Sequence, residues 1–371
     1  MRILLVNWQD LENPHAGGAE QHLFELFGRL AAKGHRVHLV CSGWQGAAGR
    51  GEVRGVSLER HGGRHSFATA ARGAIRAALR REPWDVVVED INKLPLFVPQ
   101  LTRLPVCALV PHLFGSTAFR EVPWPMAVLV ALAERPIPRA YRRAGFHAIS
   151  ESTRDDLVER GVPRERIRVI HPGVDAAACS PGGGLDRTQS PTFLYVGRLK
   201  RYKGVDVALR ALALARRERG DLSLDIAGSG DDADRLRRLA AELGLGEVVR
   251  FHGYVDEARK RGLFRSAWAN LFPSPKEGWG LTVMEAAACG TPSLASDSPG
   301  LRDSVQDGRT GYLVPHGDPS ALARRMLELA GNPGLVAELG AAARSGALAW
   351  SWADAAGATE AHLMELIAGR Y

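Results

Sequence analysis

The chain alternates short runs of β-branched and other apolar residues with longer stretches in which apolar residues recur three and four positions apart. Short apolar runs are typical of buried strands and the wider spacing is typical of helices, most clearly at 20–32. A repeated strand-then-helix order predicts parallel sheets covered by helices on both faces. We expect strands at 2–7, 35–41, 85–90, 106–112, 146–150 and 167–173 in the first half, and at 192–198, 222–228, 248–255, 269–274 and 292–296 in the second.

Length and a break in this pattern predict two domains. A chain of 371 residues is longer than one core usually serves, and residues 175–190, DAAACSPGGGLDRTQS, have the small and polar composition of a linker. We therefore expect an α/β protein with two Rossmann-like domains facing each other across a cleft, at 1–180 and 191–350. Residues 351–371 are expected to form a helix that packs back on the first domain. Ligands of such sheets bind beyond the carboxyl ends of the strands, so functional residues are expected there.

Composition and charge narrow the class of partner. Hydrophobic residues make up 45% and charged residues 24% of the chain, which is ordinary for a folded globular protein. The formal net charge of +7 suits anionic partners such as nucleotides, phosphates or an acidic membrane face, without choosing among them. Nucleic acid is not an expected partner, because the sequence has neither a basic stripe interleaved with aromatic residues nor the spacing of a zinc finger.

No membrane-spanning helix is expected. The longest uncharged apolar run, 122–133, is well short of the roughly 20 residues that a spanning helix needs. The segment RILLVN after Met1 is too short for a signal peptide and is better interpreted as a strand, so we expect a cytoplasmic location. The cysteines form no CxxC pair and are interpreted as buried thiols; they are Cys41, Cys107, Cys179 and Cys289.

A basic turn follows the first strand expected in the second half. In VGRLKRYKGVD (196–206), Gly197 allows a close backbone approach, and Arg198 and Lys203 precede the start of a helix. Two cations beside a helix N-terminus would bind a diphosphate through charge-assisted hydrogen bonds and the helix dipole. The alternative interpretation is a solvated loop, because arginine is abundant in this chain.

Two glutamates flank the expected start of another helix. In KEGWGLTVMEAAACGTP (276–292), Glu277 stands beside glycines, and Glu285 stands among small apolar residues about one turn into a helix that begins near Leu281. Carboxylates accept hydrogen bonds from paired sugar hydroxyls, and the free amides of a helix start can bind a phosphate or sugar oxygen. A surface glutamate and a first-turn glutamate favoured by the helix dipole are the equally weighted alternative.

Four segments in this order resemble the retaining family-4 glycosyltransferases. They are GGAE (17–20), VGRLKRYKG (196–204), IAGSGDD (226–232) and KEGWGLTVMEAAACGTP (276–292), and the resemblance extends over nearly the whole chain. It implies the GT-B architecture, with an N-terminal domain that binds the acceptor and a C-terminal domain that binds a nucleotide-diphosphate sugar. It also implies that the donor is a UDP- or GDP-sugar and that the acceptor bears a hydroxyl group.

The resemblance assigns most of the donor site to the second half. Arg198 and Lys203 would neutralise the donor diphosphate after the Gly197 turn, Glu285 would bind the ribose, and Glu277 would contact the transferred sugar. The backbone around Gly278, Trp279, Gly280 and Leu281 would fix the sugar ring, and that around Tyr254 and Val255 would meet the nucleobase.

In the first half, the resemblance implies that Gly17 and Gly18 belong to a loop that closes over the phosphates. His112 matches a histidine that lies near the reacting sugar carbon in similar enzymes. Its strand-end position alone favours the alternative interpretation, a packed or capping histidine.

The implied chemistry is glycosyl transfer with retention, in which leaving-group stabilisation by fixed cations is the main task. No cofactor and no metal are expected. Residues 231–234, DDAD, contain an Asp-x-Asp pattern that other glycosyltransferases use for a metal, but they open an expected helix and are ordinary first-turn acids. The alternatives to a transferase are a sugar-nucleotide epimerase or phosphorylase of the same architecture and a non-catalytic nucleotide-sugar binder.

The acceptor is the part of the reaction that the sequence leaves open: an envelope glycan, a lipid-linked acceptor and a small molecule are all compatible with it. Residues 114–145 combine an apolar stretch with several arginines. This segment would either make a peripheral contact with an anionic membrane or pack with its basic face in water. Its arginines are Arg120, Arg135, Arg139, Arg142 and Arg143.

Overall fold

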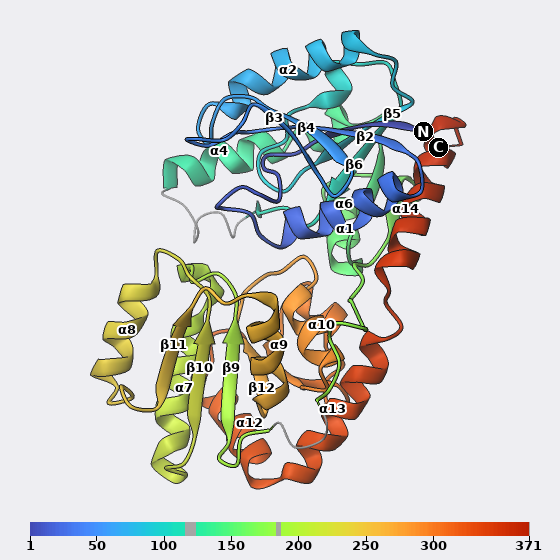
Figure 1. Cartoon of the computed structure of the whole chain (residues 1–371). Coiled ribbons are helices and arrows are strands. Elements are labelled where there is room, and N and C mark those ends of the chain that lie inside the picture. The colour runs from blue at the N-terminus through green and yellow to red at the C-terminus, as the bar shows by residue number, and fades with distance from the viewer. Residues whose placement is uncertain (116–123, 183–186, 371) are drawn as a thin grey trace. The chain divides into compact units, whose positions relative to one another are not determined.

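The computed structural model describes residues 1–115, 124–182 and 187–370. Its chain forms two compact units (Figure 1). Unit 1 comprises Met1–Gly173 and Trp352–Tyr371, and unit 2 comprises Val174–Ser351. The chain therefore changes unit at Gly173 and Val174, so that residues 174–180, expected in the first domain, belong to unit 2.

Unit 1 is built on an eight-stranded sheet with the order β3-β4-β2-β1-β5-β6-β7-β8. Neighbouring strands are parallel except for the antiparallel pair β3 and β4. The central strands are buried along nearly their whole length, as expected for parallel strands with both faces covered. The strands are β1 (Arg2–Val6), β2 (Arg36–Cys41), β3 (Arg50–Val53), β4 (Val56–Arg60), β5 (Val86–Asp90), β6 (Val106–Val110), β7 (Gly145–Ala148) and β8 (Ile167–Val169).

Helices cover both faces of this sheet; Figure 1 shows α2 above it and α1 below it. The C-terminal helix α14 (Trp352–Ile367) packs against α1, β5 and β6 of the same unit. The other helices of unit 1 are α1 (Gly18–Ala32), α2 (Phe67–Arg81), α4 (Trp124–Glu134), α5 (Ile137–Ala140) and α6 (Glu151–Glu159), with 3-10 turns η1 (Val98–Gln100) and η3 (Arg164–Arg166).

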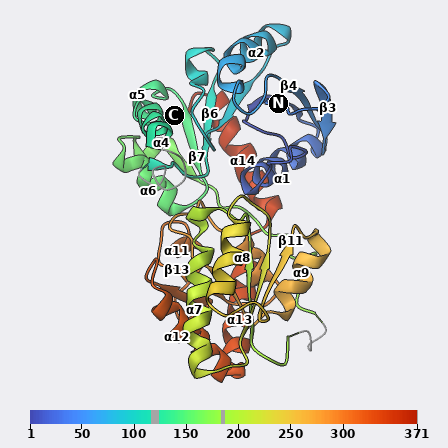
Figure 2. The same ribbon diagram turned by 90° about the vertical axis from the view of Figure 1, so that its left-hand side faces the viewer.

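Unit 2 is built on a six-stranded, fully parallel sheet with the order β11-β10-β9-β12-β13-β14. Helix α7 packs against α8 and α12, and these helices and the sheet enclose a core of buried leucine, alanine and aromatic side chains. In Figure 2, α7 and α8 lie towards the viewer. The strands are β9 (Thr192–Val196), β10 (Ser223–Ala227), β11 (Val249–Gly253), β12 (Ala269–Phe272), β13 (Ser293–Ser296) and β14 (Gly311–Val314).

The helices of unit 2 follow the strands in sequence. They are α7 (Val205–Glu218), α8 (Ala233–Glu242), α9 (Glu257–Ser266), α10 (Leu281–Ala288), α11 (Leu301–Ser304), α12 (Pro319–Gly331) and α13 (Pro333–Ala347), with the 3-10 turn η4 (Arg201–Lys203) before α7. None of the helices within the described residues is long and apolar enough to cross a bilayer.

Each sheet has a point at which the strand order reverses. In unit 1 the chain runs outward from β1 through β2 and then returns to the other side of β1 with β5. In unit 2 it runs outward from β9 through β10 and β11 and returns beside β9 with β12. Loops after the two strands at such a point diverge and leave a crevice for a ligand, so the turns after β1, β5, β9 and β12 are the favoured binding positions.

Candidate functional site

The turns after β9 and β12 bring a lysine and a glutamate together in unit 2. Lys203, the last residue of η4, places its Nζ 2.5 Å from Oε1 of Glu277, which follows β12. Both side chains are about 13% exposed, so the ion pair is largely shielded from water. This pair joins the basic turn and the glutamate loop that the sequence singled out separately.

The charge on Lys203 is stabilised by its surroundings. Burial by itself lowers the pKa of Lys203, but the Glu277 carboxylate and the neighbouring Tyr202 together outweigh burial, and the pKa lies above its ordinary value. The ammonium also lies 5.1 Å from the ring centre of Tyr202 and 5.8 Å from that of Phe272. Lys203 is therefore a fixed cation at the carboxyl end of the sheet.

Arg198 differs from Lys203 in its exposure. It follows Gly197 directly after β9, its side chain is exposed, and its carbonyl accepts a hydrogen bond from the hydroxyl of Tyr195 at 3.1 Å. No ion pair of Arg198 occurs among the described residues. Its guanidinium is thus available to an anionic ligand.

Close packing of two turns fixes this basic segment. Gly228, after β10, has φ +141°, and a Cβ there would lie 1.8 Å from the carbonyl oxygen of Gly197. Only a glycine can bring the two backbones this close. The segment IAGSGDD therefore shapes the turn that carries Arg198.

The glutamate loop ends at the N-terminus of α10. Gly280 precedes the helix with φ +90°, and Trp279 is 2% exposed, its ring 5.7 Å from that of Trp350. Within the part of the chain that the structure describes, the amides of Gly278, Gly280 and Leu281 donate to no protein acceptor. These amides and the helix dipole favour an oxygen-rich or anionic ligand.

A second loop supports the position of Glu277. The amide of Glu277 donates to the carbonyl of Pro299 at 3.1 Å, and Gly300 has φ +80°. A Cβ on Gly300 would lie 2.2 Å from the carbonyl oxygen of Glu277. This contact joins segments that are distant in the chain, so no local sequence pattern predicts it.

Glu285 is held by a lysine that sequence reasoning missed. Nζ of Lys260, in α9, lies 3.1 and 2.9 Å from the two carboxylate oxygens of Glu285 and 2.9 Å from Glu257. Burial lowers the pKa of Lys260, but the carboxylates of Glu285 and Glu257 together outweigh burial and raise the pKa above its ordinary value. Glu285 itself is 8% exposed, so the pair orients a carboxylate in a nearly dry environment.

Tyr254 and Val255 follow β11 at the edge of the same sheet. Tyr254 is 84% exposed and Val255 is partly exposed, while Gly253 has φ +67° where the chain turns out of the strand. Neither side chain is packed in the core, which leaves both backbone and ring accessible. Their assignment to the nucleobase remains a prediction.

The predicted glycine loop of unit 1 lies at the start of α1. Gly17 precedes the helix and donates its amide to Oε2 of Glu20 at 2.7 Å, while Gly18 is exposed. Oε1 of Glu20 accepts from Nδ2 of Asn92 at 3.2 Å, which ties the loop after β1 to the loop after β5. The loop is thus anchored at the reversal point of its sheet.

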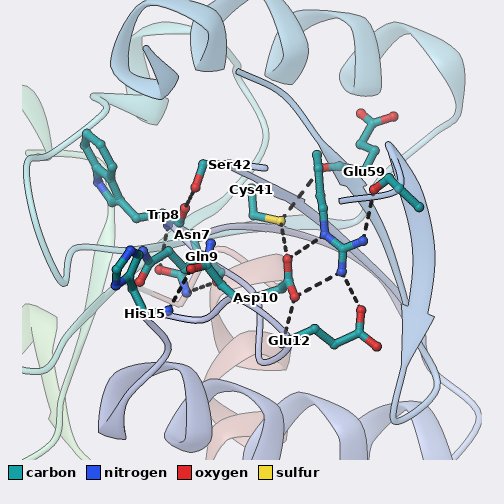
Figure 3. A network of polar contacts seen from close by, with 12 residues as sticks. Asn7, Trp8, Gln9, Asp10, Glu12, His15, Cys41, Ser42 and Glu59 are labelled. Carbon is teal, nitrogen blue, oxygen red and sulfur yellow. Dashed lines mark hydrogen bonds and ion pairs between the residues drawn. The ribbon is translucent and has the colours of Figure 1, made fainter. Parts of the chain in front are cut away.

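A buried ion pair fixes the chain just before this loop. Asp10 is fully buried and accepts from Nε and Nη2 of Arg60 at 2.8 and 3.1 Å, and the thiol of Cys41 also points at its carboxylate (Figure 3). Nη2 of Arg60 reaches Glu12 at 2.7 Å as well. A network of this kind holds the backbone between β1 and Gly17 in one conformation.

His112 follows β6 in unit 1 and is partly exposed. Its ring meets that of Phe114 edge-on, with 5.2 Å between the ring centres. The structure thus places His112 at a strand end of the sheet, as the sequence predicts, and its role in the reaction remains a prediction.

The acids of DDAD lie around the start of α8, with Asp232 directly before the helix. Asp231 pairs with Lys200 at 2.6 Å, Asp232 with Arg235 at 2.6 Å, and Asp234 with Arg237 at 3.2 Å. Each carboxylate is therefore directed at a neighbouring cation and not at a shared point.

Comparison with known proteins relates the two halves of the chain to two family descriptions. Residues 16–178 match "Glycosyltransferase Family 4", and residues 184–346 match "Glycosyl transferases group 1". A D-inositol 3-phosphate glycosyltransferase of Streptomyces avermitilis is 37% identical over 248 residues, with 62% of this chain and 52% of the relative covered. The chain thus spans about half the length of the first relatives that it matches.

A longer match and a solved structure extend over the whole chain. D-inositol 3-phosphate glycosyltransferase 2 of Catenulispora acidiphila is 30% identical, with 96% of this chain and 92% of the relative covered. The structure of a sucrose-phosphate synthase from Thermosynechococcus elongatus superposes with a TM-score of 0.86 at 22% identity, covering 99% of each chain. The resemblance and the fold class predicted from the sequence are thereby confirmed, and the chain belongs to the family-4 glycosyltransferases of GT-B fold.

Proposed function

We propose that the protein transfers a sugar, with retention of configuration, from a nucleotide-diphosphate sugar to a hydroxyl group. The observation that carries the proposal is the Lys203–Glu277 ion pair at the strand reversal of unit 2, beside the exposed Arg198 and the N-terminus of α10. Two cations and free helix amides suit a diphosphate, and a carboxylate beside them suits sugar hydroxyls.

In the proposed reaction the bond between the sugar carbon C1 and the diphosphate oxygen breaks, and negative charge develops on the leaving group. Lys203 and Arg198 neutralise that charge, a form of preorganised electrostatic stabilisation. The acceptor hydroxyl attacks C1 on the face that the diphosphate leaves, and its proton passes to the departing phosphate oxygen. No protein base is required in this scheme.

The nucleotide and sugar contacts follow from the two glutamates. Glu285, oriented by Lys260, accepts hydrogen bonds from the ribose hydroxyls. Glu277 accepts from hydroxyls of the transferred sugar, and the amides of Gly278, Gly280 and Leu281 bind oxygens of the donor. Tyr254 and Val255 meet the nucleobase.

Unit 1 supplies the remaining contacts in this proposal, with Gly17 and Gly18 at the donor phosphates and His112 beside the reacting carbon. The relatives named D-inositol 3-phosphate glycosyltransferases support a phosphorylated cyclitol as the first acceptor to test. The nucleobase, the transferred sugar and the natural acceptor are to be found by experiment.

Titration calorimetry with UDP, GDP and ADP, followed by transfer assays with the corresponding donors and NMR of the product, tests the proposal. We expect one nucleotide to bind at least tenfold more tightly than the others and the product to keep the anomeric configuration of the donor. Because cations supply the charge, transfer should persist in EDTA. An inverted product, an epimerised donor without transfer, or binding without turnover would each contradict the proposal.

A further inference from the structure

Helix α4 of unit 1 exposes large apolar side chains along most of its length. Trp124 is 73% exposed and Leu132 58%, and Met126 and Leu129 are each 49% exposed. Only Ala127 and Glu134 are buried in this helix. An apolar surface of this kind on a folded protein marks a site of interaction.

The exposed residues share one side of the helix. Trp124, Val128 and Leu132 recur four positions apart and therefore form a continuous stripe. Ala127 and Glu134 are seven positions apart and lie on the opposite side, which packs on the unit. The stripe is thus directed away from the core of unit 1.

Four arginines follow this stripe directly. Glu134 is the only carboxylate between residues 122 and 143, and it accepts the amides of Phe114 and Gly115 at 2.7 and 3.0 Å and pairs with Arg160 at 3.2 Å. The negative charge of Glu134 is therefore compensated by these partners within unit 1. The four arginines are all exposed and have no ion pair among the described residues; they are Arg135, Arg139, Arg142 and Arg143.

We propose that α4 and these four arginines, here called the α4 surface, bind an anionic lipid bilayer. The α4 helix has 11 residues, or about 16 Å at the usual rise, so it lies in the interface and does not span the bilayer. Its apolar stripe enters the region between headgroups and acyl chains, and the tryptophan at its start suits that region. The arginines bind the anionic headgroups.

Charge complementarity favours a bilayer over a protein partner. An anionic bilayer offers acyl chains to the exposed apolar helix and negative headgroups to the long arginine side chains beside it. The arginines can bind any of these headgroups, whereas a protein partner would have to place a carboxylate opposite each one. Arg120 lies outside the described residues and is not part of the α4 surface. The proposal is independent of the function proposed above, because it uses none of the donor-site residues.

Flotation with vesicles tests the α4 surface. The probes are vesicles of neutral phosphatidylcholine and vesicles in which part of that lipid is replaced by phosphatidylglycerol, at low and at physiological salt. We expect binding to the anionic vesicles that weakens as salt rises, and little binding to the neutral ones.

Two double variants separate the apolar and the charged contributions. Trp124→Ser with Leu132→Ser should lower partitioning by about tenfold or more, because two large side chains no longer enter the interface. Arg139→Glu with Arg142→Glu should lower it more than about twentyfold, since each basic residue near an anionic surface contributes about fivefold.

Matched controls on unit 1 make the same chemical changes elsewhere. Met364→Ser with Ile367→Ser removes exposed apolar residues of α14, and Arg76→Glu with Arg80→Glu reverses exposed charges of α2. Both controls should retain at least half of wild-type flotation. Circular dichroism and nucleotide calorimetry establish that each variant is folded.

The proposal is overturned by equal flotation with neutral and anionic vesicles or by α4 variants that float like the wild type. It is also overturned by sedimentation equilibrium that shows a dimer which the Trp124→Ser, Leu132→Ser variant abolishes, since a second copy would then cover the stripe. If the wild-type protein floats with anionic vesicles but binds no nucleotide, that result counts against the proposed function alone.

Discussion

Lys203 and Glu277 are 74 positions apart in the sequence, yet Nζ of the lysine lies 2.5 Å from a carboxylate oxygen of the glutamate. The pair joins the turn after β9 to the loop after β12. An ion pair this shielded holds both side chains in place before a ligand arrives, so little ordering is left to be done on binding. The two residues can then contact adjacent parts of one ligand, a diphosphate and its sugar.

Lys203→Ala is expected to weaken nucleoside diphosphate binding by tenfold or more and to lower kcat/KM for transfer by at least as much. The reason is the loss of a charge-assisted hydrogen bond to the diphosphate, typically about 1.5 to 3 kcal/mol. Calorimetry and initial-rate kinetics measure the two effects.

Lys200→Ala is the matched control, because Lys200 lies in the same turn and pairs with the exposed Asp231 at 2.6 Å. It should change binding by less than about twofold, as exposed ion pairs contribute little. Equal effects at Lys200 and Lys203, or none at Lys203, would remove the basis for a diphosphate site here.

Alanine at the two glutamates is expected to separate ribose from sugar recognition. Glu285→Ala should weaken binding of both the free nucleoside diphosphate and the intact donor by tenfold or more. Glu277→Ala should spare the nucleoside diphosphate and impair the intact donor or its turnover, because the nucleoside diphosphate lacks the sugar. Calorimetry with each ligand gives the comparison.

Glu257→Ala is the control for Glu285→Ala, because it also removes a carboxylate that pairs with Lys260. It removes an exposed partner of that lysine, 2.9 Å away, and leaves Glu285 in place. We expect near wild-type affinity for both ligands. If both variants lose affinity equally for both ligands, the assignment of Glu285 to the ribose and Glu277 to the transferred sugar is wrong.

The buried strands could be predicted from the sequence because both faces of a central parallel strand are covered, which leaves an uninterrupted apolar run. β1 with RILLV and β5 with VVVED are examples, and each lies within its predicted range. The edge hairpin β3 and β4 was missed, since RGEV of β3 is mostly exposed and has no apolar run. β14, with four residues after a turn, was missed as well.

The sequence could predict only those residues of the candidate site that belong to a local motif. Arg198, Lys203 and Glu277 stand in turns that contain glycine and follow apolar runs, so their strand-end positions follow from the pattern. Glu285 lies in the helix that begins after the second of these turns. Lys260 could not be found this way, because it stands among other basic residues in α9 and its partner is 25 positions away. Such a pairing depends on helix packing, which a periodic pattern does not specify.

Gly300→Ala is expected to lower transfer activity by tenfold or more, since the added Cβ would meet the carbonyl oxygen of Glu277 and displace the glutamate loop. Gly308→Ala is the matched control: its φ of +71° resembles the +80° of Gly300, but a Cβ there meets nothing within 4 Å. Both variants pay about 1 to 2 kcal/mol of left-handed strain in stability. Similar activity in the two would show that the close approach has no functional effect.

Acid is expected to destabilise unit 1 through its buried histidines. Burial, and to a lesser extent the neighbouring His147, lowers the pKa of His22 to about 3. Burial also lowers the pKa of His147 to about 3, with smaller contributions from His362 and His171. The ring of His22 lies 5.9 Å from that of His147 and 5.8 Å from that of Trp352, so the group joins α1, β7 and α14. Both histidines are therefore neutral in the folded protein at neutral pH.

The sign of the effect follows from the unfolded state, in which histidine has a pKa near 6.5 and takes up a proton first. Stability is then complete above about pH 6.5 and falls as the pH drops towards 3, by about 2 kcal/mol per histidine at pH 5. Urea denaturation at pH 7.5 and pH 5 measures the free energy of unfolding. His22→Phe should reduce the difference between the two, whereas a phenylalanine at the exposed His65 should not. A free energy of unfolding that does not fall between pH 7.5 and pH 5 would mean that these histidines are not buried in the neutral form.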